Sequence, residues 1–339
     1  GAETLSAETF YDQGEVKKAH CANCTIGCEK LITIPGSKNE KVRMEYQSLY
    51  AMGPLNGVND QKSVLRNSKF CDEMGIDTIS AGATIAWYLE CVELGLLDSF
   101  QRPVEEEGDN QESVRNLLEL VVHRKGIGNI LAEGSAKGSD IIGAGSEKLA
   151  MHVKGLELPG YEPRTLKALA LAMSVSTRGA CHNRSSAYDW DFSNKNDGNP
   201  ERVGKAVIDG EDYSAVMDSL IWCKFVRKVF DDFYLESSEI INEVTGWDMT
   251  PEELRKCGER INNLKKLFNI REGWKIEDDT LPYRILSEPV TEGPNEGDSL
   301  SEDELTVMID SYYKIRGWEK DGTIPSQKLE EMDLFNLMR

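Results

Sequence analysis

Residues 77–96 read DTISAGATIAWYLECVELGL, and this stretch predicts one long helix. Polar and small side chains open it, beginning with Asp77 and Thr78, and an apolar face that includes Ile85, Trp87 and Tyr88 follows. The pattern indicates that helices, rather than strands, make up most of the chain.

Three further helices are predicted from the residues at their ends. Residues 112–123 carry Val and Leu at helical spacing, and this helix should end before Gly126. The four residues 250–253 combine an N-cap Thr, a Pro at the first helical position and a Glu that can close a capping box, so a helix over 251–268 is expected. The four residues 301–304 repeat this capping arrangement and predict a fourth helix.

Strand signals are thin, so the predicted fold class is mainly α, with two helical domains. Residues 30–34 and 42–46 predict a short hairpin. The segment 154–160 has the composition of a junction and puts the domain boundary near residue 150. The domains are therefore expected to comprise residues 1–150 and 151–339.

The charge balance argues against several classes of function. The chain has 339 residues with 39 Lys+Arg and 59 Asp+Glu, a net charge of −20 with His neutral. This charge repels nucleic-acid phosphates and anionic membranes, and no apolar stretch reaches the ~20 residues that span a bilayer. The first five residues lack the features of a signal peptide, so we interpret the eight cysteines as cytoplasmic thiols available for metal binding.

A dense cysteine motif lies near the start of the chain. Cys21, Cys24 and Cys28 follow the pattern C-x2-C-x3-C. Three thiolates this close can face one inorganic centre, and both tetrahedral zinc and a [4Fe–4S] cluster need such ligands together with a fourth. His20 is the nearby fourth ligand for zinc, whereas a distant cysteine would favour the cluster.

The spacing alone leaves that fourth ligand open. Cys91 lies in the apolar part of the 77–96 helix and is most simply a core residue. Composition does not choose among Cys71, Cys181 and Cys223.

Four blocks of sequence then occur in a characteristic order. They are the cysteine motif, residues 71–80 (CDEMGIDTIS), residues 178–182 (RGACH) and residues 312–318 (YYKIRGW). Together they resemble the aldehyde ferredoxin oxidoreductase family over nearly the whole chain. The resemblance implies domains 2 and 3 of that family, a tungsten or molybdenum bis-pterin, and a [4Fe–4S] cluster. It also implies oxidation of an aldehyde to a carboxylic acid, with electrons passed through the cluster to ferredoxin.

The resemblance assigns the ligands of the cluster. Cys21, Cys24 and Cys28 match the three clustered iron ligands of the family, and Cys223 matches the distant fourth. Because Cys223 also ends a pterin motif, the cluster is expected close to one pterin.

The family's pterin motif, D-x-x-G-L-[DC], matches twice. Residues 72–77 match with Ile76 in place of Leu, and residues 218–223 match with Ile221 in place of Gly and Trp222 in place of Leu. A carboxylate accepts hydrogen bonds from pterin N–H donors. The expected cofactor-binding residues are Asp72, Ile76, Asp77, Arg184, Asp218 and Trp222.

Plainer interpretations exist for each of these side chains. The Asp residues of both motifs can be ordinary helix caps. Trp222 can be a packing residue of the core, and Arg184 can form a surface salt bridge.

Glu45 and His182 match the family's polar pair near the metal. Oxidation of an aldehyde releases protons as two electrons leave the substrate, and a carboxylate and an imidazole can accept and relay them. The alternatives are a solvated strand residue for Glu45 and a loop hydrogen bond for His182.

The expected partners follow from the same resemblance. Lys224, Arg227 and Lys228 form a basic island on which acidic ferredoxin could dock. The family's N-terminal β-rich domain, which forms a base under the pterins, has no counterpart in this sequence, so a separate domain or subunit is an expected partner, and a homo-oligomer is compatible. The alternative functions are a tungsten-dependent aryl-CoA or acid reductase-type subunit and a non-catalytic, truncated helical metal-binding domain.

Overall fold

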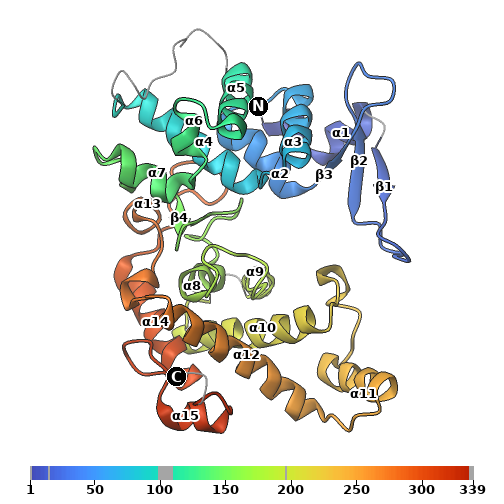
Figure 1. Cartoon of the computed structure of the whole chain (residues 1–339), viewed down its shortest axis with the longest axis vertical. Coiled ribbons are helices and arrows are strands. Elements are labelled where there is room, and N and C mark those ends of the chain that lie inside the picture. Colours follow the sequence, from blue (N-terminus) through green and yellow to red (C-terminus); the bar gives the residue numbers. More distant parts are fainter. Residues whose placement is uncertain (1, 14–15, 98–109, 195–196, 336–339) are drawn as a thin grey trace. The chain divides into compact units, whose positions relative to one another are not determined.

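The computed structural model describes residues 2–13, 16–97, 110–194 and 197–335. It divides the chain into two compact units: unit 1 comprises residues 1–161 and 282–284, and unit 2 comprises residues 162–281 and 285–339. Helices account for 57% and strands for 5%, which confirms the prediction of a mainly α fold (Figure 1).

Unit 1 is a group of helices with a small antiparallel sheet. Its helices are α1 (Ala7–Gln13), α2 (Tyr46–Met52), α3 (Gln61–Met74), α4 (Thr78–Glu93), α5 (Asn110–His123), α6 (Gly128–Leu131) and α7 (Gly134–Ile142), with short 3-10 helices at Ala2–Leu5, Pro54–Asn56 and Ser146–Lys148. Its strands are β1 (Val16–Ala19), β2 (Glu29–Thr33) and β3 (Lys41–Met44), in the order β1-β2-β3, and the short pair β4 (His152–Val153) and β5 (Leu156–Glu157).

All three secondary-structure predictions in unit 1 are confirmed. The stretch 77–96 contains α4, which begins after its cap Asp77 and ends at Glu93, and the helix predicted over 112–123 lies within α5. The predicted hairpin is β2 paired with β3 in the register Lys30↔Met44. The sequence did not predict β1. Its residues Val16-Lys17-Lys18-Ala19 are exposed or half-buried, so β1 shows no alternation of apolar side chains and depends on its pairing with β2.

The core of unit 1 lies between α3, α4 and α5. Val64, Leu65, Ile85, Tyr88 and Leu118 are fully buried in it. On the other side of α4, helix α2 approaches closely at Gly82, where an added Cβ would lie 2.4 Å from the carbonyl oxygen of Ala51. A glycine is therefore needed where these two helices cross.

Unit 2 is built around α10. Its helices are α8 (Lys167–Val175), α9 (Tyr188–Ser193), α10 (Pro200–Ser219), α11 (Phe233–Thr245), α12 (Pro251–Arg271), α14 (Glu302–Arg316) and α15 (Ser326–Glu331), with 3-10 helices η4 (Lys224–Val226) and η5 (Ile276–Asp278). Helix α13 (Tyr283–Ser287) lies where the chain passes from the residues of unit 1 back into unit 2. Helix α10 packs against α8, α12 and α14 (Figure 1).

The capping predictions in unit 2 are confirmed. Thr250 and Glu253 form a capping box at the start of α12, and Ser301 and Glu304 form one at the start of α14. At the start of α8, the carboxylate of Asp191 accepts backbone N–H bonds from Ala168 and Leu169. This cap comes from 22 or more residues away, so no local pattern indicates it.

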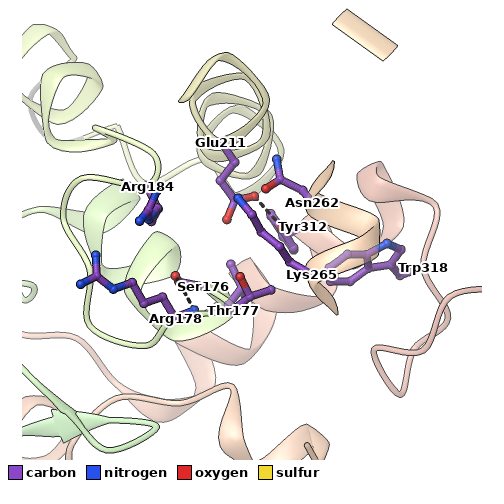
Figure 2. A pocket seen from close by; sticks show the side chains of 10 residues that line it. Ser176, Thr177, Arg178, Arg184, Glu211, Asn262, Lys265, Tyr312 and Trp318 are labelled. Atoms are coloured by element: carbon purple, nitrogen blue, oxygen red, sulfur yellow. Dashed lines mark hydrogen bonds between the residues drawn. The ribbon is translucent and has the colours of Figure 1, made fainter. Parts of the chain in front are cut away.

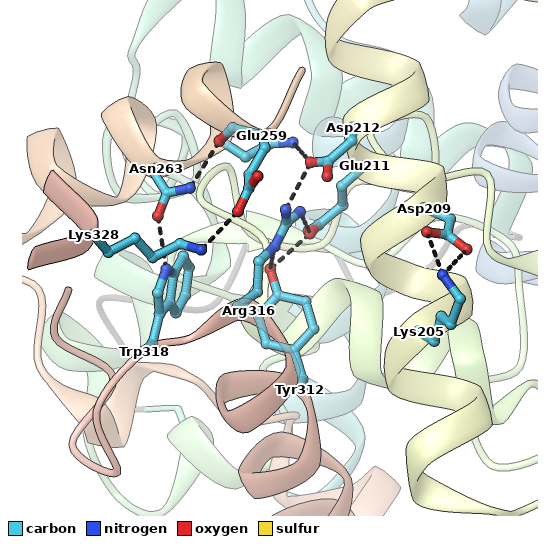
Figure 3. Close-up of polar contacts among 11 residues, drawn as sticks. Lys205, Asp209, Glu211, Asp212, Glu259, Asn263, Tyr312, Arg316, Trp318 and Lys328 are labelled. Atoms are coloured by element: carbon cyan, nitrogen blue, oxygen red, sulfur yellow. Dashed lines mark hydrogen bonds and ion pairs between the residues drawn. The ribbon is translucent and has the colours of Figure 1, made fainter. Parts of the chain in front are cut away.

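A buried polar network joins α10 to α14 (Figure 3). Arg316 donates to Glu211 and to Asp212, each at 2.7 Å, and the hydroxyl of Tyr312 donates to Glu211 at 2.6 Å. Burial raises the pKa of Glu211, whereas Arg316 acts in the opposite direction. A buried guanidinium thus holds two carboxylates of α10 against α14.

Within the described residues, no helix combines the length and the apolar character that a membrane crossing requires.

Candidate cofactor site

The cysteine motif forms the loop of a β-hairpin. Strands β1 and β2 pair as far as Ala19↔Glu29, so residues 20–28 close the hairpin. Cys21 is exposed, and Cys24 and Cys28 are half-buried. The loop turns back on itself through two left-handed residues, Asn23 (φ 60°) and Gly27 (φ 57°). All three thiols are thus carried by one tight loop.

Backbone N–H groups point towards one of these thiols. The N–H of Ile26 lies 3.4 Å from Sγ of Cys24. The N–H groups of Gly27 and Ile26 lower the pKa of the Cys24 thiol. His20 is held in the same loop, because its Nδ1 lies 3.1 Å from the carbonyl oxygen of Cys24. The loop therefore favours a thiolate at Cys24, which is the form that ligates iron.

The donor set fits an iron–sulfur cluster in its chemistry, with three thiols and backbone N–H groups directed at sulfur. Among the residues that the structure describes, no group of three or more His, Cys, Asp or Glu side chains is gathered closely enough to hold a metal ion. Ligation by Cys21, Cys24 and Cys28 consequently stays a prediction.

The first pterin motif is a tight turn between α3 and α4. Gly75 has a left-handed conformation (φ 71°), and its N–H donates to the carbonyl of Asp72. The N–H of Ile76 donates to the carbonyl of Cys71 at 2.9 Å. The side chain of Asp77 then caps α4 by accepting the N–H of Ser80 at 2.8 Å. The carboxylate of Asp72 is exposed, as a ligand-binding acceptor has to be.

The second pterin motif forms the same turn at the end of α10. Ile221 is left-handed (φ 61°), and its N–H donates to the carbonyl of Asp218 at 3.2 Å. The N–H of Trp222 donates to the carbonyl of Met217 at 2.9 Å. Cys223 precedes η4 with φ −68° and ψ 135°, close to the φ −65° and ψ 123° of Asp77. The two motifs thus share one backbone conformation despite their differences in sequence.

The left-handed backbone conformation is strained at Ile221. A β-branched residue is strongly disfavoured in the left-handed region, where glycine is at ease. Its side chain is 92% exposed, so no packing within unit 2 offsets the strain. The replacement of Gly by Ile therefore leaves the turn intact and stores strain in it.

The side chains of the second motif form more ion pairs and ring contacts than those of the first. Asp218 forms ion pairs with Arg184 and, at 2.9 Å, with Lys224. The ring of Trp222 packs edge-on against Phe230, 4.7 Å between centroids, in an apolar cluster of unit 2. Arg184 therefore positions the Asp218 carboxylate, which keeps lone pairs for a further donor.

Glu45 and His182 lie in different units. Glu45 is exposed and stands between β3 and α2, whose first turn begins at its carbonyl group. His182 is half-buried in the loop between α8 and α9. Burial, together with the positive charge of Arg178, lowers the pKa of His182. The shift favours the neutral imidazole, which is the form that accepts a proton.

The comparison with known proteins decides the family. Residues 1–334 match the model of "Aldehyde ferredoxin oxidoreductase, domains 2 & 3". The chain belongs to this family. It is 36% identical over 345 residues to the tungsten-containing aldehyde ferredoxin oxidoreductase of Pyrococcus furiosus, which covers 97% of this chain and 54% of the relative. The enzyme of the same name from Thermococcus kodakarensis is 35% identical over 349 residues, covering 98% and 55%.

Two more distant matches are a curated sequence and a solved structure. The aliphatic sulfonate oxidoreductase, WOR-like subunit, of Pyrococcus furiosus is 26% identical over 355 residues, covering 99% of this chain and 54% of the relative. The active site complex BamBC of benzoyl coenzyme A reductase with 1,5-dienoyl-CoA has a TM-score of 0.81 at 22% identity, covering 98% and 55%. The chain thus spans about half the length of the curated relatives it matches.

The basic island of this family member is largely neutralised within the chain. Lys224 pairs with Asp218, and Arg227 and Lys228 both pair with Asp189, at 2.9 and 3.3 Å. The Lys228 side chain is 76% exposed, whereas those of Lys224 and Arg227 are mostly buried. Lys228 is therefore the residue of the island best placed to meet a partner.

The motifs did not indicate one further feature, a cavity of about 220 Å³ in unit 2 (Figure 2). Arg178 and Arg184 line it from the loop after α8, and Lys265 lines it from α12. The sequence did not indicate Lys265 as a site residue, because a lysine in a charged helix is most simply a solvated residue.

Proposed function

We propose that this chain forms the cofactor-binding part of a tungsten-containing enzyme that oxidises an aldehyde to a carboxylic acid and passes two electrons through a [4Fe–4S] cluster to ferredoxin. One observation carries the proposal: both pterin motifs, at 72–77 and 218–223, form the same turn, in a chain 36% identical to a tungsten-containing aldehyde ferredoxin oxidoreductase.

Four thiols would hold the cluster in this proposal. Cys21, Cys24 and Cys28 come from the hairpin loop of unit 1, and Cys223 comes from the end of the second turn in unit 2. Backbone N–H groups near Cys24 lower the pKa of its thiol and would tune the potential of a bound cluster.

The two turns would hold the pterins. Asp72 and Asp218 offer carboxylate oxygens to pterin N–H donors. Arg184 orients Asp218, and Asp77 fixes the start of α4 beside Asp72. Ile76 and Trp222 follow the left-handed residues and anchor the turns through the cores of their units.

The bound metal–pterin centre would polarise the aldehyde carbonyl and accept the electrons. Conversion of an aldehyde and water to a carboxylic acid releases two electrons and two protons. The neutral imidazole of His182 would accept and relay one of these protons, and the Glu45 carboxylate would accept the other. An aldehyde is the favoured substrate because the relatives at 35–36% identity are named for aldehyde oxidation.

The proposed setting is the cytoplasm, and the proposed electron acceptor is ferredoxin. The curated relatives extend well beyond the matched residues. A pterin-base domain, present as further sequence or as a separate subunit, would complete the cofactor site.

The test is aldehyde-dependent reduction of a viologen dye by the protein purified anaerobically from tungstate-supplied cells, with any co-purifying subunit retained. We expect Glu45→Gln and His182→Asn each to lower kcat by about 100-fold or more, since general acid–base groups contribute 10²–10⁴-fold. The matched control is Glu147→Gln, an exposed carboxylate outside the proposed site, which should keep full activity.

Two outcomes would contradict the proposal. Full activity in both site variants would remove Glu45 and His182 from the chemistry. Turnover of aryl-CoA thioesters with a reduced dye, and none of aldehydes, would instead favour a reductase-type subunit.

A further inference from the structure

The loop between α8 and α9, residues 176–187, carries His182 and is made of turns rather than a helix or a strand. Cys181 and Ser185 in this loop are buried, and the ring of His182 is half-buried. Turns have no continuous ladder of backbone hydrogen bonds, so contacts with neighbouring elements hold such a loop in place. The position of the imidazole therefore depends on where the loop is attached.

The side chain of Asn269, on α12, fixes the start of this loop. Its Nδ2 donates to the carbonyl oxygen of Thr177 at 2.7 Å, although the two residues are 92 positions apart in the chain. Asn269 is half-buried, so the bond is partly shielded from water. A side-chain amide that donates to a loop carbonyl satisfies that polar group and fixes its place. Asn269 thus ties residue 177 to α12.

The end of the loop lies against α10 at Gly210. A Cβ added to Gly210 would lie 2.2 Å from the carbonyl oxygen of Ser185, whereas real Cβ atoms stay at least 3.0 Å from such neighbours. Alanine is the better helix former in the interior of a helix. What glycine provides at this position is therefore the close approach of the loop to α10.

The two attachments flank His182 in the chain. Thr177 precedes His182 by five residues, and Ser185 follows it by three. Between them the backbone turns at Gly179, whose φ of 94° is left-handed. A short segment that is fixed at both ends has few alternative paths. A shift at either attachment is therefore passed on to the imidazole.

We propose that Asn269 and Gly210 are positioning residues, which hold this loop from α12 and α10 and thereby set the place and the surroundings of His182 for proton transfer. The inference rests on the proposed function, in which His182 is a proton acceptor. Burial and the charge of Arg178 lower the pKa of His182, and both depend on where the loop lies. A displacement of about 1 Å can lower a reaction rate by roughly 10²-fold.

The first measurement is the titration of His182 followed by NMR in the full chain, which requires no turnover. Asn269→Leu removes the donor to the loop carbonyl. Gly210→Ala forces the carbonyl oxygen of Ser185 to move by about 0.8 Å, from 2.2 Å to 3.0 Å. Each change should expose the imidazole and raise its pKa towards the ordinary value of 6.5. Asn269→Gln keeps an amide donor and should stay closer to the wild type than Asn269→Leu.

Two controls make the same kinds of change away from this loop. Gly128→Ala, in unit 1, places a Cβ 2.2 Å from the carbonyl oxygen of Leu120, which matches the clash on α10. Asn242→Leu removes an amide that exchanges hydrogen bonds of 2.7 and 2.9 Å with the backbone of Met249, beyond the end of α11. Both controls should lower Tm about as much as the test variants and leave the pKa of His182 unchanged.

The second measurement separates substrate binding from chemistry. In aldehyde-dependent dye reduction, Asn269→Leu and Gly210→Ala should lower kcat by about tenfold or more and change KM little, because a displaced proton acceptor acts on the chemical step. The pKa that limits kcat/KM on the acid side should rise together with the NMR pKa of His182. A wild type that oxidises no aldehyde contradicts the proposed function, and the NMR comparison still decides the positioning role.

Two results would overturn the proposal. One is a pKa of His182 that stays at the wild-type value in both Asn269→Leu and Gly210→Ala. The other is an equal rise of that pKa in Gly128→Ala and Asn242→Leu. Circular dichroism identifies a Gly210→Ala protein that fails to fold, in which case the comparison of Asn269→Leu with Asn269→Gln decides.

Discussion

Gly75 and Ile221 occupy the same left-handed position in two equivalent turns, with φ of 71° and 61°. In each turn the N–H of this residue donates three residues back, and the N–H of the next residue donates five back. The two turns lie in different units and share this geometry although one uses glycine and the other a β-branched residue. The backbone conformation, more than the sequence pattern, is what the two motifs have in common.

Removal of the backbone strain at Ile221 should stabilise the protein. We expect Ile221→Gly to raise the free energy of unfolding by about 1 kcal/mol, because the left-handed conformation costs a non-glycine residue roughly 1–2 kcal/mol and glycine returns part of that as entropy. Urea denaturation of the full chain measures the change. The reciprocal variant Gly75→Ala should lose about 1 kcal/mol. An Ile221→Gly protein less stable than the wild type would show that the exposed side chain has a stabilising contact.

Iron content tests the cluster ligands. After anaerobic reconstitution with iron and sulfide, the wild type should hold about four iron atoms per chain and show broad visible absorption. Replacement of Cys21, Cys24, Cys28 or Cys223 by Ser should remove most of this iron. Cys257→Ser, a half-buried thiol in α12, is the control and should retain it. Full iron in Cys223→Ser would exclude that residue as the fourth ligand.

Breaking the polar network between α10 and α14 should lower the free energy of unfolding substantially. Arg316→Met leaves the carboxylates of Glu211 and Asp212 without their shared cation, and we expect a loss of about 3–5 kcal/mol. Lys205→Met removes the exposed pair with Asp209 on α10, also drawn in Figure 3, and should cost less than about 0.5 kcal/mol. Similar losses for the two variants in denaturant titrations would argue that the buried network contributes little.

Asp191 should make stability depend on pH. Burial raises the pKa of Asp191 to about 6, above its ordinary value of 3.8. The folded state then holds a proton between these values that the unfolded state has lost, so the contribution of Asp191 to stability falls as pH rises through this window. The stability of the wild type relative to Asp191→Asn should be greater at pH 4 than at pH 7, by up to roughly 3 kcal/mol.

Unfolding free energies of both proteins at several pH values measure this difference. The wild type and Asp191→Asn are compared at the same pH, so the contributions of the other titrating groups cancel. A difference that stays constant from pH 4 to pH 7 would mean that the Asp191 carboxylate is not perturbed in the folded state.

Ferredoxin docking is best tested at Lys228. Lys228→Glu should slow the reduction of ferredoxin several-fold at low salt and much less at high salt, because an exposed charge acts mainly on association. Dye reduction should not change. Lys320→Glu introduces the same charge change elsewhere on unit 2 and is the control. A rate that does not respond to Lys228→Glu at any salt concentration would place the docking surface elsewhere.

The sequence by itself determined the features that depend on neighbouring residues. The capping boxes at Thr250 and Ser301, the start of α4 and the hairpin of β2 and β3 follow from local hydrogen bonding and periodicity, so they could be predicted. The two matches to the pterin motif likewise located both turns. Their residues contact one another within five positions along the chain.

Only the tertiary structure decided what depends on residues far apart in the chain. Asp218 meets Arg184 across 34 positions, and the carboxylate of Asp191 caps α8 from more than 20 positions away. The cavity with Lys265 exists only because α10 packs against both α8 and α12. Such contacts arise when packing brings distant segments together, and the free energy that selects them comes from burial of whole helix faces, which no short stretch of residues encodes.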